Sequence, residues 1–177
     1  MNNAIKQATK TLHESLELLP FNQKMFRGEQ TDQERTAYLL SNLEIFEILD
    51  PHVPEDFRRA PFIENDIKNL NQPLEECPSI THGYCTYLEA ICSDLRPHIY
   101  LNYMGFMFGG QIMKKRYPEA SSMYDFDDIE QKRQYIRDRI VEDYNSPHWI
   151  SFVSEVKHGF KWHIGISEEL GNIYNVG

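Results

Sequence analysis

Apolar residues recur at spacings of three and four along almost the whole chain, a period that predicts α-helices rather than β-strands. The first apolar stripe comprises Ile5, Ala8, Leu12, Leu16 and Leu19, and it ends before Pro20. Thr31 and Glu34 have the spacing of a capping box, so a second helix is expected to begin there and to stop at Asp50. Convincing strand alternation is absent from the sequence.

The same period predicts further helices over 62–70, 78–95, 97–117 and 127–140, with a last helix from 147 onward. Asp127 and Asp128 place negative charge at the start of a helix, where it complements the helix dipole. Ser146 followed by Pro147 is typical of an N-cap and a first helical position. We therefore expect one all-α domain over residues 1–177, a bundle of about seven helices around one pocket.

Composition narrows the class of protein. A content of 41% hydrophobic and 12% aromatic residues argues against disorder, and 18 basic against 27 acidic residues argue against general nucleic-acid binding. No apolar run is long enough to span a membrane or to form a signal peptide. The three cysteines, Cys77, Cys85 and Cys92, form neither a disulfide framework nor a zinc motif. These features favour a cytoplasmic protein, which we expect to be a monomer.

The expected helix over 97–117 contains an anomaly, because Gly105, Gly109 and Gly110 interrupt an otherwise strongly apolar segment. Each glycine costs about 1 kcal/mol relative to alanine in a helix interior. A kink, a close helix crossing, or a flat ligand lying against bare backbone would compensate for this cost. Gly105 and Gly109 are four residues apart and share one face. Their spacing alone fits close helix packing and a planar ligand about equally well.

In the first expected helix, His13 lies beside the apolar stripe, next to Leu12 and Leu16. Its segment ATKTLHE (residues 8–14) and the glycine segment HIYLNYMGFMFGGQIMKK (residues 98–115) together resemble heme oxygenase. The resemblance extends over most of the chain. It implies an all-helical fold with heme b between the first helix and a kinked distal helix. It also implies cleavage of heme to biliverdin, CO and Fe²⁺ with O₂ and external electrons.

The resemblance assigns roles to particular residues of the site. His13 would be the metal ligand, donating an imidazole nitrogen to the heme iron. Glu17, one turn later, would orient its ring, although an exposed helix carboxylate is an equally good interpretation. Gly105, Gly109 and Gly110 would form the distal wall, whose missing side chains admit the porphyrin and O₂.

Cations are expected around the two heme propionates. The basic residues at matching positions are Lys6, Lys10, Arg133 and Arg137. Arg133 and Arg137 are four residues apart and share a helix face, but they would also fit a solvated face beside Asp138 and Glu142. Three aromatic residues are expected to pack near the pocket: Tyr100, Tyr103 and Phe160.

The chain departs from the family pattern Gly-Asp-x-Ser-Gly-Gly-Gln at two positions. Phe106 stands where the aspartate is expected, and Phe108 stands where the serine is expected. Asn102 occupies a position where arginine is frequent. A phenyl ring cannot relay a proton, so water would have to be held by Asn102 or by glycine carbonyls. We expect retained turnover, with heme binding without degradation as the alternative.

Two other classes of protein compete with this interpretation. A non-heme di-iron oxidase would need Glu-x-x-His pairs on two helices, and the sequence has one clear match, Glu155 with His158. A helical partner-binding protein without a cofactor is the other. For an oxygenase the electrons must come from outside, since no dinucleotide-binding or iron–sulfur motif is present. Ferredoxin or a flavoprotein reductase is therefore the expected partner, docking on the basic run Lys114, Lys115 and Arg116.

Overall fold

The computed structural model describes residues 2–73, 77–91 and 93–176, and its regular structure within these ranges is entirely helical. The predicted all-α class is therefore confirmed. Nine α-helices lie in the described part of the chain: α1 (Asn2–Leu18), α2 (Pro20–Arg27), α3 (Asp32–Leu49), α4 (Ala60–Leu70), α5 (Ser79–Ala90), α6 (Arg96–Phe108), α7 (Gly110–Arg116), α8 (Ile129–Tyr135) and α9 (Trp149–Ile173). Short 3₁₀ turns connect several of them, and α8 continues into a π-helical turn over Ile136–Ile140.

Local signals in the sequence set several of these boundaries. The capping box is present, because the Thr31 side chain accepts from the Glu34 backbone N–H at 3.2 Å and Glu34 accepts from the Thr31 N–H at 2.7 Å. Pro20 opens α2 at the first helical position, where its missing N–H carries no cost. The helix count exceeds the expected seven partly because the segment over 97–117 is divided at Gly109 into α6 and α7.

The predicted start of the last helix was wrong. α9 begins at Trp149, with His148 as its N-cap residue, and not at Pro147. The Ser146 hydroxyl instead accepts from the His148 backbone N–H at 3.1 Å, inside the turn that precedes the helix. A serine hydroxyl can accept a hydrogen bond within a local turn as readily as at a helix N-terminus, and in this structure Ser146 makes the bond within the turn.

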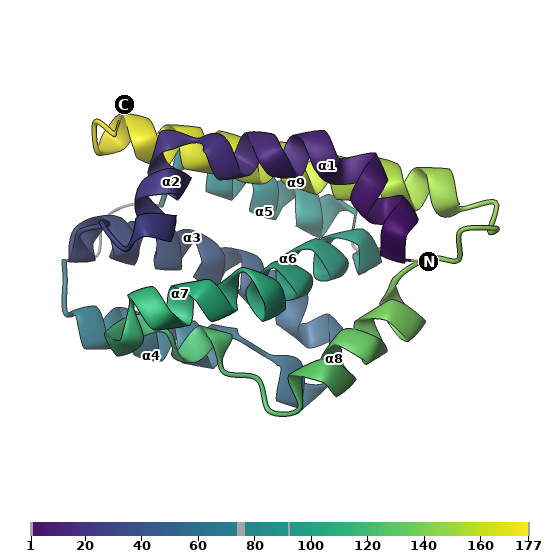
Figure 1. Ribbon diagram of the computed structural model, residues 1–177, viewed down its shortest axis with the longest axis horizontal. Coiled ribbons are helices and arrows are strands. Elements are labelled where there is room, and N and C mark those ends of the chain that lie inside the picture. The colour runs from purple at the N-terminus through teal and green to yellow at the C-terminus, as the bar shows by residue number, and fades with distance from the viewer. Residues whose placement is uncertain (1, 74–76, 92, 177) are drawn as a thin grey trace.

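The long helix α9 organises the bundle. It packs against α1, α5 and α6, while α3 packs against α4 and α5. In Figure 1, α1 and α9 run side by side along one edge, and α6 continues into α7 across the middle of the molecule. Side chains on α9 can therefore contact both the first helix and the glycine-containing helix, the two elements predicted to enclose a ligand.

Two further sequence expectations can be compared with the structure. Cys77 and Cys85 are free thiols, whereas Cys92 lies outside the described residues. Within the described ranges, every helix is too short or too polar to cross a membrane.

Candidate active site

His13 projects from the exposed side of α1. Its side chain is 57% exposed, and Nδ1 lies 3.4 Å from Glu17 Oε1, one helical turn away. The imidazole also meets the ring of Phe160 from α9 edge-on, with 5.8 Å between the ring centroids. These contacts hold the ring from two sides. Because Glu17 faces Nδ1, Nε2 is the nitrogen that remains to coordinate a metal.

The face of α1 that carries His13 also carries Lys6, which contacts the end of α6. Lys6, Lys10, His13 and Glu17 follow each other at spacings of four, three and four, so they lie on one face of the helix. Lys6 Nζ lies 5.7 Å from the centroid of the Phe108 ring, at the end of α6. This contact places the His13 face of α1 on the same side as the glycine segment.

The three glycines of the distal segment differ in their surroundings. Outside its own helix, no heavy atom of the described residues lies within 4 Å of a Cβ built at Gly105. A Cβ at Gly109 would lie 3.3 Å from the Gly105 carbonyl oxygen. A Cβ at Gly110 would lie 2.3 Å from the Tyr124 ring, so this glycine is required for packing. The open backbone expected for a flat ligand is therefore found at Gly105, and Gly110 faces the core.

Phe106 and Phe108 point in different directions. Phe106 is only 6% exposed and packs between Phe46 and Tyr124, with centroid distances of 4.6 and 5.2 Å. Phe108 is 41% exposed, three residues after Gly105 and on the same side of α6. Position 106 therefore contributes an apolar ring to the core and no polar group to the ligand face.

The basic residues predicted to bind propionates are spread over two helices. The Arg133 guanidinium stacks on the Phe108 ring at 3.9 Å, donates to the Met107 carbonyl oxygen and pairs with Glu130. Lys6 approaches the same ring from α1, so Phe108 joins α1, α6 and α8. Sequence reasoning missed this contact, because it depends on how the three helices pack.

The other candidate residues around the site have the following contacts. Lys10 pairs with Glu14 at 3.6 Å, and both side chains are largely exposed. Arg137 Nη1 donates to Gln134 Oε1 at 3.3 Å. Burial raises the pKa of Tyr100, and the positive charge of Arg137 opposes this shift.

A buried polar group next to Asn102 also escaped the sequence analysis. Asn102 is 4% exposed and donates to the His98 carbonyl oxygen at 2.9 Å. His98 is fully buried, and its Nδ1 lies 2.8 Å from the Tyr84 hydroxyl of α5. The spacing of four between His98 and Asn102, continued by Gly105 three residues later, was the available signal.

Some of the basic residues at the end of α7 already have partners within the protein. Lys114 pairs with Asp125, and the methylene groups of Arg116 pack against Gly28, with Arg116 Cδ 3.3 Å from an added Cβ. Lys115 is exposed. The local positive charge is therefore smaller than the three residues suggest.

The di-iron alternative finds no support in the side-chain geometry. Across the described ranges, no three His, Cys, Asp or Glu side chains are placed to hold a metal ion. Glu155 instead accepts from the Tyr87 hydroxyl at 2.5 Å, and His158 packs against the Tyr87 ring.

Comparison with known proteins decides the family. Residues 1–145 match the family model described as Heme oxygenase. The chain belongs to the heme oxygenase family.

Individual relatives are distant in sequence and close in fold. Heme oxygenase 1 of Gallus gallus is 26% identical over 137 residues, covering 65% of this chain and 46% of that protein. The chain thus spans about half the length of this relative.

Three solved structures share the fold. Heme oxygenase from Leptospira interrogans has a TM-score of 0.80 at 20% identity, covering 94% of this chain and 98% of that one. Heme oxygenase-1 of Synechocystis sp. PCC6803 in complex with heme has a TM-score of 0.81 at 17% identity, covering 98% and 93%. Heme oxygenase-2 of Synechocystis sp. PCC 6803 in complex with heme and NO has a TM-score of 0.84 at 17% identity, covering 97% and 85%.

Proposed function

We propose that this member of the heme oxygenase family cleaves heme b to biliverdin, CO and Fe²⁺, using O₂ and electrons from an external donor. The observation that carries the proposal is the exposed His13 imidazole, oriented through Nδ1 by Glu17 and through its ring by Phe160. Bound heme supplies the iron and O₂ chemistry. The chain supplies the axial nitrogen and the bare backbone at Gly105 that lets a flat ligand approach.

Residues around the ligand face would hold the heme edge and orient it. Lys6, Arg133 and Arg137 offer cationic groups for the propionates, with Lys10 farther along the α1 face. In the structure Lys6 and Arg133 contact Phe108, so heme binding would exchange these cation–π contacts for charge-assisted hydrogen bonds. For Arg133 the exchange would also replace its hydrogen bond to the Met107 carbonyl oxygen and its ion pair with Glu130.

Heme titration tests the binding step. We expect the ferric complex of the wild-type protein to show a Soret band at one equivalent of heme, and we expect His13→Ala to lose the histidine-ligated spectrum. His82→Ala is the matched control, since His82 is 60% exposed and also faces a carboxylate, Glu44, at 3.1 Å. An unchanged spectrum in His13→Ala would contradict the assignment of the ligand.

Turnover separates an oxygenase from the second candidate function, a heme carrier or sensor. The burial of Phe106 favours that alternative, because position 106 offers no polar group near the ligand. With ferredoxin, its reductase and O₂ supplied, we expect the heme bands to decay while biliverdin absorbance appears. Stable heme absorbance under these conditions would identify a carrier or sensor.

The electron donor is proposed to be an acidic ferredoxin or a flavoprotein reductase that meets the end of α7. Lys115 and Arg116 carry this proposal more than Lys114, which is paired with Asp125. We place this protein in the cytoplasm as a monomer. The Lys115→Gln/Arg116→Gln double variant should raise the apparent KM for the donor severalfold without changing heme affinity. Lys68→Gln on α4 is the control, and a loss of heme affinity in the double variant would argue against docking at this surface.

A further inference from the structure

Three aromatic side chains of α5 and α9 form a ladder between the interior and the edge of the bundle: Tyr84, Trp162 and Tyr87. The two helices run along each other (Figure 1). The ring of Tyr84 is fully buried and stacks on Trp162, with 5.7 Å between the centroids and 16° between the planes. Trp162 also meets the half-buried ring of Tyr87 at 6.0 Å. Both distances are those of interacting aromatic pairs, so the ladder joins a buried phenol to one near the surface.

The phenol at the inner end of the ladder has a base at its hydroxyl. The Tyr84 oxygen lies 2.8 Å from Nδ1 of His98, whose ring is fully buried. Burial lowers the pKa of His98 to about 4, so the ring is neutral near pH 7. In the tautomer that carries its hydrogen on Nε2, Nδ1 accepts the Tyr84 hydroxyl. If Nδ1 takes up the phenolic proton, the charged ring has Glu155 Oε2 at ion-pair distance, 3.5 Å from Nε2.

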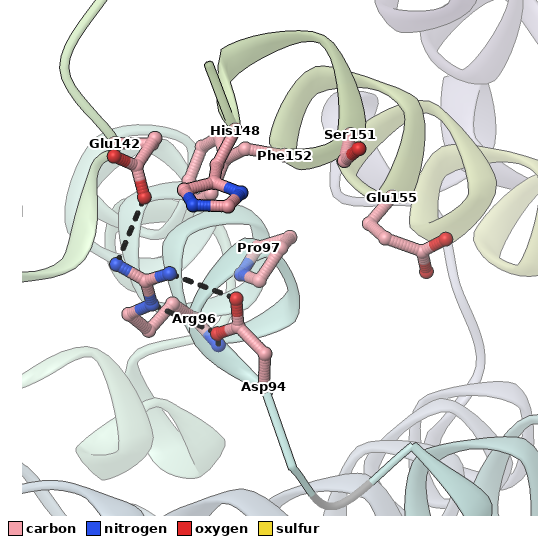
Figure 2. A pocket seen from close by; sticks show the side chains of 8 residues that line it. All are labelled: Asp94, Arg96, Pro97, Glu142, His148, Ser151, Phe152 and Glu155. Atoms are coloured by element: carbon pink, nitrogen blue, oxygen red, sulfur yellow. Dashed lines mark hydrogen bonds and ion pairs between the residues drawn. The ribbon is translucent and has the colours of Figure 1, made fainter. Parts of the chain in front are cut away.

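The phenol at the outer end also has a base at its hydroxyl. Tyr87 donates to Glu155 Oε2 at 2.5 Å. Glu155 borders a cavity of about 390 Å³ at the beginning of α6 and α9. Figure 2 shows its carboxylate pointing away from Arg96, which pairs instead with Asp94 and Glu142. Glu155 is therefore not neutralised by Arg96, and it can accept the hydroxyl proton of Tyr87.

Trp162 lies between the two phenols and differs from them. Across the described ranges, its buried Nε1–H has no hydrogen-bond partner. An oxidised indole at this position therefore has no base to take its proton, whereas each phenol has one. Burial raises the pKa of Tyr84 and of Tyr87, so both are protonated at pH 7 and must release a proton when they are oxidised. An oxidising equivalent is thus expected to pass through Trp162 and to stay on a tyrosine.

The inner end of the ladder lies near the proposed axial ligand. A Cβ added at Gly159 of α9 would lie 3.1 Å from His98 Nδ1, so the imidazole packs against the backbone of that residue. The next residue is Phe160, whose ring meets the His13 ring at 5.8 Å. The pair of Tyr84 and His98 therefore lies against the turn of α9 that carries Phe160 to His13.

We propose that Tyr84, Trp162 and Tyr87 carry an oxidising equivalent from the heme side of α9 to the edge of the bundle. The oxidant is heme that has reacted with peroxide, and this source rests on the proposed function. Tyr84 loses one electron to the oxidant and its hydroxyl proton to His98 Nδ1. An electron from Tyr87 then passes through Trp162 to the Tyr84 radical, and His98 returns the proton. The Tyr87 hydroxyl proton moves to Glu155. A soluble reductant such as ascorbate supplies the electron that restores Tyr87, and Glu155 gives its proton back.

The first test uses heme-free protein with ¹⁵N-labelled histidine and flash-generated tris(bipyridine)ruthenium(III) as the oxidant. In Tyr87→Phe, a radical on Tyr84 has no outer phenol to move to. We expect this variant to give a tyrosyl EPR signal coupled to ¹⁵N, because the Tyr84 hydroxyl bonds to a histidine nitrogen. Adding Tyr84→Phe should abolish the coupled signal, and adding Trp162→Phe should lower its yield at least tenfold.

Tyr144→Phe, added to the same Tyr87→Phe background, is the matched control. Tyr144 meets Trp149 at 5.4 Å in a separate pair of a tyrosine and a tryptophan, so this change should leave the coupled signal intact. The path is overturned if Tyr87→Phe gives no ¹⁵N-coupled signal, or if the yield of that signal does not depend on Trp162.

The second test treats the ferric heme complex with hydrogen peroxide. We expect Tyr84→Phe and Trp162→Phe each to increase severalfold the heme bleached per peroxide, because oxidised heme without this outlet destroys itself, and to leave heme affinity within twofold. Trp162→Phe keeps the Tyr84 hydroxyl, so it stays informative if Tyr84→Phe does not fold. Wild-type bleaching in both variants would refute the assigned role of the ladder. A wild-type protein that binds no heme would instead refute the proposed function, and the photochemical test on the heme-free protein would still decide whether the ladder conducts.

Discussion

Replacing Phe106 by aspartate restores the carboxylate of the family pattern, but the structure predicts a folding defect rather than a gain of function. The ring is 6% exposed and lies between Phe46 and Tyr124. Removing a buried phenylalanine side chain costs about 3–5 kcal/mol, and an unpaired buried carboxyl adds a desolvation penalty. We therefore expect Phe106→Asp to lose about 4 kcal/mol or more at pH 7. At roughly 2–4 °C per kcal/mol for a chain of this size, the melting temperature should fall by about 8–16 °C.

Urea unfolding followed by circular dichroism measures this loss, and its pH dependence identifies the cause. Burial would raise the folded-state pKa of the new carboxyl above its unfolded value of about 3.9. The folded state then binds the extra proton, so the deficit should be smallest below pH 4 and should grow as the pH rises through the folded-state pKa.

Phe106→Leu is the matched control. It keeps an apolar side chain, so it should cost about 1–2 kcal/mol and show no additional pH dependence between pH 4 and 7. If Phe106→Asp loses less than about 1 kcal/mol and degrades heme faster than wild type, the side chain at position 106 faces the ligand, and its placement in the core is incorrect.

Four other substitutions test separate contacts. Gly110→Ala should destabilise the fold by about 1–3 kcal/mol in urea titrations, because its Cβ would overlap the Tyr124 ring, whereas Gly105→Ala should fold normally and weaken heme binding measured by Soret titration. Phe108→Ser should increase the rate of heme association in stopped-flow mixing, since it releases the two cations that stack on this ring. His98→Gln should reduce the loss of stability between pH 6.5 and 4: a buried histidine with a lowered pKa stabilises the fold above its unfolded-state pKa, and this contribution is lost as the pH falls toward about 4.

Much of the fold follows from signals that are local in the sequence. The capping box at Thr31 and the proline at position 20 act through bonds and torsions within a few residues, and both appear as predicted. The start of α9 was misplaced because Ser146 has two local hydrogen-bonding solutions, and the choice between them depends on the packing of the helix that follows. The division at Gly109 was indicated by the glycines, but the sequence alone did not separate a kink from two helices.

In the candidate site, too, contacts within one helix could be predicted from the sequence, whereas contacts between elements could not. The contact of His13 with Glu17 lies within one helix and follows from a spacing of four. The packing of Gly110 depends on Tyr124, which lies in a 3₁₀ turn between α7 and α8. The periodicity of the sequence does not predict this contact. The roles of these residues toward heme stay predictions, because they depend on a ligand that the local pattern cannot place.

The two phenylalanines of the distal segment show why a departure from a family motif must be judged by direction as well as by residue type. They are two residues apart, so on a helix their side chains point about 200° apart. Phe106 enters the core, where an aspartate would be costly, and Phe108 faces Lys6 and Arg133 on the ligand side. With an apolar residue at both positions, the nearest preceding polar side chain of α6 on the Gly105 face is Asn102, one turn earlier. His98, one turn before Asn102, is buried and its Nδ1 lies 2.8 Å from the Tyr84 hydroxyl, so these two polar groups of α6 are enclosed by the bundle and do not replace an exposed carboxylate at position 106.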